Sequence, residues 1–247
     1  MAALPFVGRW IIARTVRGMR EGDAMIDFTQ LRRTMVDGQI RVNDVTDPRI
    51  IDAMLELPRE RFVPEARASL AYLDEDPLVR EAAAGRPARY LIEPMAFAKL
   101  VQALDLAAGD SVLDVGCATG YSAAVLGRLA GRVIALEQDE ELAARARRLL
   151  AELGTGNVEV VTGPLAAGAP GKGPYDAILL NGSVEVVPEA LFAQLADGGR
   201  LGAVVRSGPM GRAILHVRIG GAVSKRPLFD ATIPPLPGFA APRQFVF

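Results

Sequence analysis

The stretch VLDVGCATGYSAAV, residues 112–125, combines a carboxylate with two closely spaced glycines, in the order Asp114, Gly116 and Gly120. Glycines at such a turn let a ligand approach the backbone closely. A helix that begins directly after the turn offers free N–H groups to the same ligand. The pattern therefore predicts a binding site for an adenosine-containing cofactor, which is either a dinucleotide or S-adenosylmethionine.

The spacing of the glycines favours S-adenosylmethionine. The dinucleotide fingerprint G-x-G-x-x-G, counted from Gly116, requires glycine at positions 118 and 121, where this chain has Ala118 and Tyr121. The third glycine of the fingerprint lets helix and strand pack closely, and a tyrosine there prevents this. Asp114 is unfavourable beside a pyrophosphate but favourable beside the cationic, amino-bearing end of S-adenosylmethionine. An NAD-dependent oxidoreductase is therefore disfavoured.

Other polar candidates stand directly after predicted strands. Glu137 lies 21 residues beyond Gly116, where an acidic residue can accept hydrogen bonds from the ribose hydroxyls of either cofactor. Asn181 follows a later strand and is either a hydrogen-bonding partner of cofactor or substrate, or a turn residue. Further cofactor-binding candidates are Cys117, Gln138 and Gly163.

The residue counts and the net charge of the sequence exclude other classes of function. One cysteine and one histidine exclude an internal disulfide and a zinc site built from these residues, so we predict no metal and a reducing, cytoplasmic location. The net charge of −1 provides no field for nucleic acid. Arginines interrupt the apolar run FVGRWIIARTVRGMR, so we expect no stable insertion into a membrane. The oligomeric state does not follow from the sequence.

Strands and helices alternate from residue 111 to residue 206, which predicts an α/β fold with a parallel sheet covered on both faces. The predicted strands are SVLDVG, RVIALE, NVEVVTG, YDAILLN and GRLGAVVR, and the helices between them are YSAAVLGRLA, DEELAARARRLLAELG and PEALFAQLA. RAILHVRI and the terminal RQFVF follow without a helical spacer. They predict antiparallel pairing at one edge of the sheet.

The part of the chain before residue 109 is predicted to be mainly helical. In DPRIIDAMLELP, Asp47 is placed as an N-cap and Pro48 in the first helical turn. VREAAAGRPAR, residues 79–89, is predicted to be a mobile connection, and a helix is predicted after Pro94. We expect a disordered extension over residues 1–24, a helical cap with the active-site segment over 25–108, and the cofactor-binding domain over 109–247.

Several segments together resemble the protein-L-isoaspartate O-methyltransferases, a family of class I S-adenosylmethionine-dependent methyltransferases. These segments are MVDGQIRVNDVTDPRIIDAMLELPRERFVPEARASLAYLDED, the region from VLDVGCATGY to NVEVVTG, PYDAILLNGSVEVVPEALFAQLADGGRL and the closing FVF. The resemblance runs from about Met25 to Phe247, and LPRERFVP is a distinctive part of it. It implies a seven-stranded Rossmann-like methyltransferase sheet, mostly parallel with an antiparallel edge, and an N-terminal helical cap. It also implies methyl transfer from S-adenosylmethionine to the α-carboxylate of isoaspartyl residues in damaged proteins.

The chain departs from this family in the active-site segment. Where the family has a GHGQTISQP-like sequence with a serine at the reaction centre, Ile92 stands at the serine and Glu93 at the next position. Glu93 is either a charge at a helix N-terminus or a group that contacts substrate. No catalytic side chain is assigned. Three functions stay open: repair of damaged proteins or peptides, methylation of another substrate such as a small molecule, and cofactor binding without catalysis.

Overall fold

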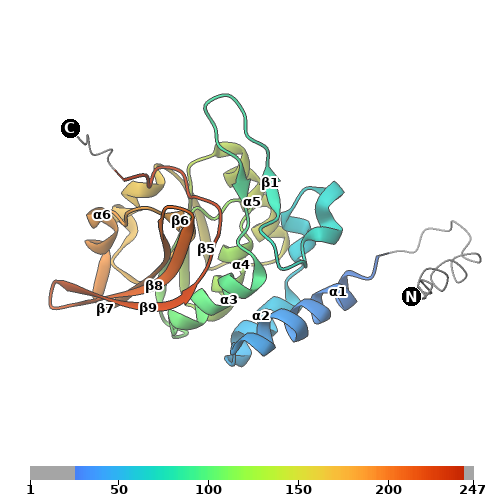
Figure 1. Ribbon diagram of the computed structural model, residues 1–247, viewed down its shortest axis with the longest axis horizontal. Coiled ribbons are helices and arrows are strands. Elements are labelled where there is room, and N and C mark those ends of the chain that lie inside the picture. Colours follow the sequence, from blue (N-terminus) through green and yellow to red (C-terminus); the bar gives the residue numbers. More distant parts are fainter. Residues whose placement is uncertain (1–25, 242–247) are drawn as a thin grey trace, which may run out of the picture.

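The computed structural model describes residues 26–241, and Figure 1 shows them as a twisted sheet with helices packed around it. The predictions for residues 1–24 and for the terminal RQFVF lie outside the described residues. Among the described helices, none is long and apolar enough to cross a membrane.

The sheet has seven strands in the order β5-β4-β3-β6-β7-β8-β9, as predicted for the fold class. The strands are β3 (Ser111–Val115), β4 (Arg132–Glu137), β5 (Val158–Thr162), β6 (Tyr175–Val184), β7 (Leu195–Ser207), β8 (Met210–Ile219) and β9 (Ala222–Asp230). Strands β5, β4, β3, β6 and β7 are parallel to one another, and β8 and β9 are antiparallel to their neighbours. The mostly parallel sheet with an antiparallel edge is therefore confirmed.

One strand and one helix differ from the sequence prediction. Strand β9 was not predicted, because its sequence AVSKRPLFD is polar and contains Pro227. An edge strand tolerates a proline, since one side of it has no hydrogen-bonded neighbour, and its charged side chains discourage pairing with other chains. The helix predicted for PEALFAQLA is only α6 (Glu189–Phe192), because the chain already enters β7 at Leu195, which pairs with Tyr175.

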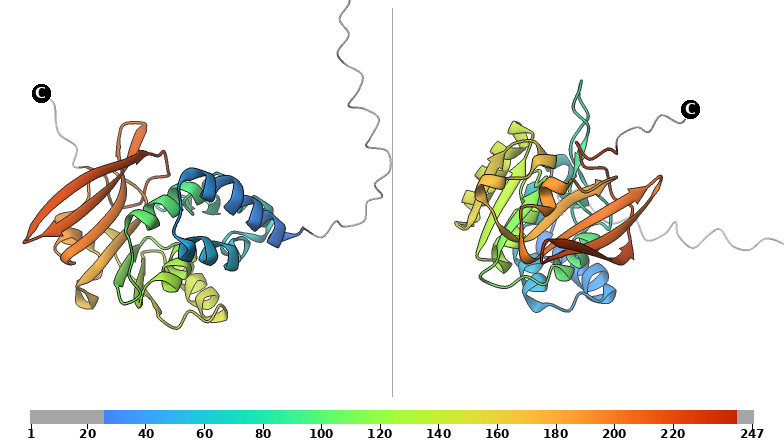
Figure 2. Two further views of the ribbon diagram at one scale, coloured as in Figure 1. Left: turned by 90° about the horizontal axis from the view of Figure 1, so that it is seen from below. Right: turned by 90° about the vertical axis from the view of Figure 1, so that its left-hand side faces the viewer.

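Both faces of the central strands β3, β4 and β6 are buried, as predicted for the parallel part of the sheet. Successive residues of a strand point to opposite faces, and in β3 Val112 belongs to one buried cluster while Leu113 and Val115 belong to the other. The helices of the first cluster are α1 (Phe28–Met35), α2 (Pro48–Glu56), α3 (Pro94–Ala103), α4 (Tyr121–Leu129) and α5 (Glu140–Glu152). Figure 2 shows the N-terminal helices beside the sheet, at the end away from β8 and β9.

Local helix signals are confirmed at two helix starts. The Asp47 side chain accepts a hydrogen bond from the Arg49 N–H at the start of α2, and Pro48 occupies the first turn. At α5 the Asp139 side chain accepts hydrogen bonds from the N–H groups of Glu141 and Leu142. The division of the chain at residues 108 and 109 stays a prediction, since one buried cluster contains side chains from both sides of it.

Residues 78–90 form a hairpin that projects from the body of the protein (Figure 1). Its strands are β1 (Leu78–Arg80) and β2 (Arg89–Tyr90), which pair antiparallel. The sequence predicts only a mobile connection over residues 79–89, whereas the structure has strands at both ends of it. These strands could not be predicted from the residues because they are only three and two residues long.

Candidate active site

The glycine turn lies between β3 and α4. Gly116 and Gly120 have φ angles of +78° and +96°, and Ala118 between them has a φ of +49°. These are left-handed conformations, which glycine adopts without the steric cost that a side chain imposes. The N–H groups of Gly116 and Cys117 donate to the Leu136 carbonyl oxygen at 2.8 and 3.2 Å. The turn is therefore fixed to the end of the neighbouring strand β4.

Asp114 is fully buried near the end of β3. Its carboxylate accepts hydrogen bonds from Ser122 Oγ at 2.7 Å and from Asn181 Nδ2 at 2.5 Å. Burial, which disfavours the charged form, raises the pKa of Asp114 to about 7 although these two hydrogen bonds lower it. The structure thus brings two predicted site residues, Asp114 and Asn181, into direct contact, and Ser122 is a partner that the sequence analysis missed.

Glu137, at the end of the adjacent strand β4, is also fully buried. Its carboxylate accepts hydrogen bonds from the backbone N–H groups of Ala118, Gln138 and Asp139 at 2.9, 2.9 and 3.0 Å. It also forms a bidentate ion pair with Arg89, in which Nη1 and Nη2 lie 2.5 and 2.8 Å from the two carboxylate oxygens. The group that is suited to accept ribose hydroxyls therefore already has a cationic partner.

Arg89 belongs to the hairpin, and its side chain is only 3% exposed. Its Nη2 also donates to the Gly116 carbonyl oxygen at 3.2 Å. No role for this arginine is predicted from the sequence. The available signal was weak, because one of three arginines in a segment of small and polar residues does not reveal a partner that lies 48 residues away.

The volume of free space around the turn differs between the two sides of Arg89. On one side, two cavities of about 10 Å³ each lie against residues 90–92 and Asn181. On the other side, a groove of about 430 Å³ is lined by Gln138 and Gly163 together with residues 85–87 of the hairpin. A cavity of 10 Å³ is about the minimum for one water molecule. The hairpin therefore divides the crevice that contains the predicted cofactor residues.

A second segment, which contains Leu236, also fills the crevice. A Cβ atom on Gly116 would lie 2.6 Å from Leu236 Cδ1, and one on Gly182 would lie 3.0 Å from Leu236 Cβ. The Leu236 N–H donates to the Ser183 carbonyl oxygen at 2.8 Å, which fixes this segment beside the end of β6. Leu236 and the hairpin together cover the glycine turn in this conformation.

Ile92 and Glu93 lie side by side but face different surroundings. Ile92 is buried and lines both small cavities, whereas Glu93 lines neither. Glu93 is the N-cap residue of α3, yet its carboxylate makes no capping hydrogen bond, and its N–H donates to Asp76 Oδ1 at 2.9 Å. Burial, followed by repulsion from Asp76 and Asp74, raises the pKa of Glu93 to about 7. Its place at a helix start agrees with the sequence, while a contact with substrate stays a prediction.

Arg59, from the motif LPRERFVP, is a further residue of the site that had not been singled out. Its side chain is buried, and Nη2 donates to the Ile92 carbonyl oxygen at 2.7 Å. The guanidinium carbon lies 4.6 Å from the centre of the Tyr121 ring, within the range of a cation–π interaction. Arg59, Tyr121 and Ile92 line the same small cavity beside Gly116.

Cys117 and His216 are not arranged for nucleophilic catalysis. Burial raises the pKa of the Cys117 thiol well above its usual range, which opposes formation of the reactive thiolate. His216 lies on β8 with its ring 5.1 Å from that of Phe192, and burial lowers its pKa. Across residues 26–241, no group of three or more His, Cys, Asp and Glu side chains is arranged to hold a metal ion.

Comparison with known proteins decides the family. The model of the family described as protein-L-isoaspartate(D-aspartate) O-methyltransferase matches residues 30–220. The chain belongs to this family. Among relatives of this methyltransferase family, protein-L-isoaspartate O-methyltransferase 2 of Anaeromyxobacter is 44% identical over 75% of this chain and 73% of its own length. The protein-L-isoaspartate O-methyltransferase of Rhodopseudomonas palustris is 41% identical over 83% of this chain and 92% of its own length.

A solved structure supports the same family assignment. A protein-L-isoaspartate O-methyltransferase superposes with a TM-score of 0.72 at 26% sequence identity, covering 85% of this chain and 66% of that chain. The resemblance of the sequence to the isoaspartyl methyltransferases is therefore confirmed, as is the predicted fold class.

Proposed function

We propose that this protein is an S-adenosylmethionine-dependent methyltransferase that esterifies the α-carboxylate of isoaspartyl residues in damaged proteins and peptides. The observation that carries the proposal is the family match over residues 30–220, which includes the whole glycine turn and both buried carboxylates beside it. These carboxylates, Asp114 and Glu137, come from adjacent parallel strands, where open α/β sheets bind their ligands.

The residues around the turn have the chemical groups that S-adenosylmethionine requires. Glu137 supplies acceptors for two ribose hydroxyls, and Asp114 supplies a negative charge for the amino-bearing, cationic end. Gln138 and Gly163 line the groove that has room for a flat base. When it is bound, the cofactor supplies a methyl group activated on a sulfonium. Arg89 and Leu236 occupy part of the crevice in this conformation, so binding requires both to move.

The acceptor carboxylate needs positioning more than it needs a base. A carboxylic acid with an ordinary pKa near 4 is already ionised at neutral pH, so its oxygen is ready to attack the methyl group. Holding that oxygen in line with the methyl group is then the main contribution of the protein. Arg59 and Tyr121 are among the polar side chains that line the cavity beside Ile92, and the charge of Arg59 attracts an anionic acceptor.

Two observations favour the alternatives. Ile92 gives the approach an apolar wall, which favours an acceptor other than an anionic peptide. The ion pair between Arg89 and Glu137 favours a protein that binds the cofactor weakly or without turnover. These observations support, in turn, a methyltransferase for another substrate, including a small molecule, and a non-catalytic S-adenosylmethionine-binding protein.

Label transfer from S-adenosylmethionine to a matched pair of peptides separates these functions. The pair has the same sequence with either an isoaspartyl or a normal aspartyl residue. We expect a base-labile methyl ester on the isoaspartyl peptide alone. Cofactor binding without label on that peptide would instead leave the second or third function, and label on a small-molecule acceptor would select the second.

The partners and location follow from this function. We infer that damaged polypeptides are the partners, that nucleic acid is not, since the net charge is −1, and that the enzyme acts in the cytoplasm, where a single thiol stays reduced. Fractionation of cells followed by immunodetection tests the location.

A further inference from the structure

The ion pair between Arg89 and Glu137 is not explained by the proposed chemistry. A methyl donor with ribose hydroxyls needs the carboxylate of Glu137 as an acceptor, yet a guanidinium now donates to each of its two oxygens. Arg89 donates through two parallel N–H groups, which is the strongest geometry for a guanidinium and a carboxylate. The two partners are 3% and 0% exposed, so water does not screen the pair.

The position of Arg89 makes it a direct competitor for the site. Its Nη2 bonds both the Glu137 carboxylate and the Gly116 carbonyl oxygen, so the guanidinium lies across the glycine turn. A ligand that reaches from Asp114 and Asn181 on one side to Gln138 and Gly163 on the other has to pass this position. The cavities on the first side measure only about 10 Å³ each while Arg89 is in place.

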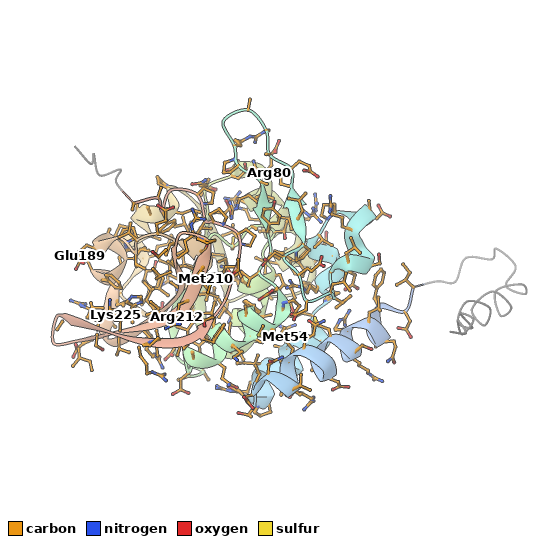
Figure 3. The ribbon with its side chains drawn as sticks, viewed as in Figure 1. Met54, Arg80, Glu189, Met210, Arg212 and Lys225 are labelled. Atoms are coloured by element: carbon orange, nitrogen blue, oxygen red, sulfur yellow. The ribbon has the colours of Figure 1, made fainter. Side chains whose placement is uncertain are left out.

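Other arginines of the hairpin hold it against the same end of β4 and the start of α5. Arg80 Nη1 lies 2.5 Å from Asp139 Oδ2, and Figure 3 labels Arg80 at the base of the hairpin. Arg86 Nη1 lies 3.4 Å from Asp139 Oδ2 and 3.4 Å from Glu141 Oε2. The hairpin is therefore attached by a row of ion pairs, of which the pair of Arg89 is the most buried.

When Arg89 leaves, the Glu137 carboxylate has free acceptor positions for ribose hydroxyls. The carboxylate keeps its three backbone N–H donors, from Ala118, Gln138 and Asp139, whatever the arginine does. Ribose hydroxyls can then take the two acceptor positions that the guanidinium leaves. The groove of about 430 Å³ beside the hairpin gives the freed guanidinium access to water.

We propose that Arg89 is an internal ligand of Glu137 that competes with the ribose of S-adenosylmethionine and thereby sets the affinity of the crevice for this cofactor. The inference rests on the proposed function. It adds a residue of the hairpin to those that determine cofactor affinity, and it makes cofactor binding depend on the departure of Arg89.

Calorimetric titration with S-adenosylhomocysteine, the product form of the cofactor, tests the competition. Arg89→Met removes every donor of this side chain and keeps much of its apolar bulk. We expect its Kd to be lower than that of the wild type by at least about tenfold, since the loss of one competing hydrogen bond to a charged group changes a Kd by about this factor. The matched control is Arg67→Met, which removes an exposed arginine that pairs with Glu81 beside β1 at 3.3 Å. Because exposed pairs contribute little, its Kd should stay within about twofold of the wild type.

The outcomes separate the inference from the function on which it rests. A wild-type protein that binds S-adenosylhomocysteine, together with an Arg89→Met variant that binds equally or more weakly, would overturn the competition and leave the proposed function intact. Absence of binding by both proteins would overturn the proposed cofactor and the inference together.

Arginine modification of the wild-type protein gives a second readout that does not depend on a variant folding. Phenylglyoxal, with mass spectrometry of the peptides, should leave Arg89 unmodified in the free protein and modify it when S-adenosylhomocysteine is bound. Arg67, which is exposed, should react in both states, and Arg59, which is 1% exposed, in neither. Protection of Arg89 that persists at saturating ligand would refute its release.

Discussion

Replacing Glu137 by glutamine should destabilise the fold, because it removes the charge that the buried Arg89 requires. Glu137 Oε1 accepts from Arg89 Nη1 and from the N–H groups of Gln138 and Asp139, and Oε2 accepts from Arg89 Nη2 and the Ala118 N–H. In either orientation of a glutamine amide, its NH₂ group faces one of these two sets of N–H donors and cannot accept hydrogen bonds from them. Breaking a buried pair by removing one partner costs about 3–5 kcal/mol, and we expect this loss in the free energy of unfolding.

A double-mutant cycle measured by urea unfolding separates the ion pair from other effects of these substitutions. Glu137→Gln and Arg89→Met should each destabilise the protein. The double variant should be more stable than the sum of the two losses predicts, by about 2–3 kcal/mol, since neither buried group is then left without its partner. Additivity within about 0.5 kcal/mol would refute the claim that Arg89 and Glu137 stabilise each other.

Because the pKa of Asp114 is raised from 3.8 to about 7, the folded chain retains a proton that the unfolded chain releases. The contribution of Asp114 to the free energy of unfolding is therefore complete below about pH 4 and is lost as the pH rises to about 7. Asp114→Asn should remove this part of the pH dependence of the free energy of unfolding, measured with urea. Gly116→Ala places a Cβ 2.6 Å from Leu236 Cδ1 at a φ of +78° and should cost about 1–3 kcal/mol in thermal unfolding, whereas Gly109→Ala, with nothing within 4 Å, should change stability by less than about 0.5 kcal/mol. Ile92→Ser restores a hydroxyl beside the reaction site and should raise kcat/KM for the isoaspartyl peptide by about tenfold, while an unchanged or lower value would refute a positioning role for that hydroxyl.

Features that depend on a few neighbouring residues could be predicted from the sequence. Asp47 and Asp139 cap their helices as expected, because a capping side chain bonds N–H groups two or three residues away. The parallel strands were recognisable because burial on both faces makes them continuously apolar. The positions of Asp114 and Glu137 at the ends of adjacent strands follow from the same pattern.

Features that depend on distant contacts could not be predicted in this way. Arg89 and Glu137 are 48 positions apart, and nothing in either local sequence identifies the other partner. Strand β9 carries Lys225 and Pro227 and forms only because the edge of the sheet accepts it. The closure of the crevice by Leu236 likewise depends on the fold, since it brings residue 236 against Gly116.

The most direct test of the central claim is a calorimetric titration that asks whether Asp114 and Glu137 hold the methyl donor. Wild-type protein should bind about one equivalent of S-adenosylhomocysteine and show no binding of NAD. Asp114→Asn, which removes the carboxylate without changing its size, should raise the Kd for S-adenosylhomocysteine by at least about tenfold, as expected for the loss of a charge-assisted contact. Binding of NAD, or a Kd for S-adenosylhomocysteine that Asp114→Asn leaves unchanged, would contradict the account.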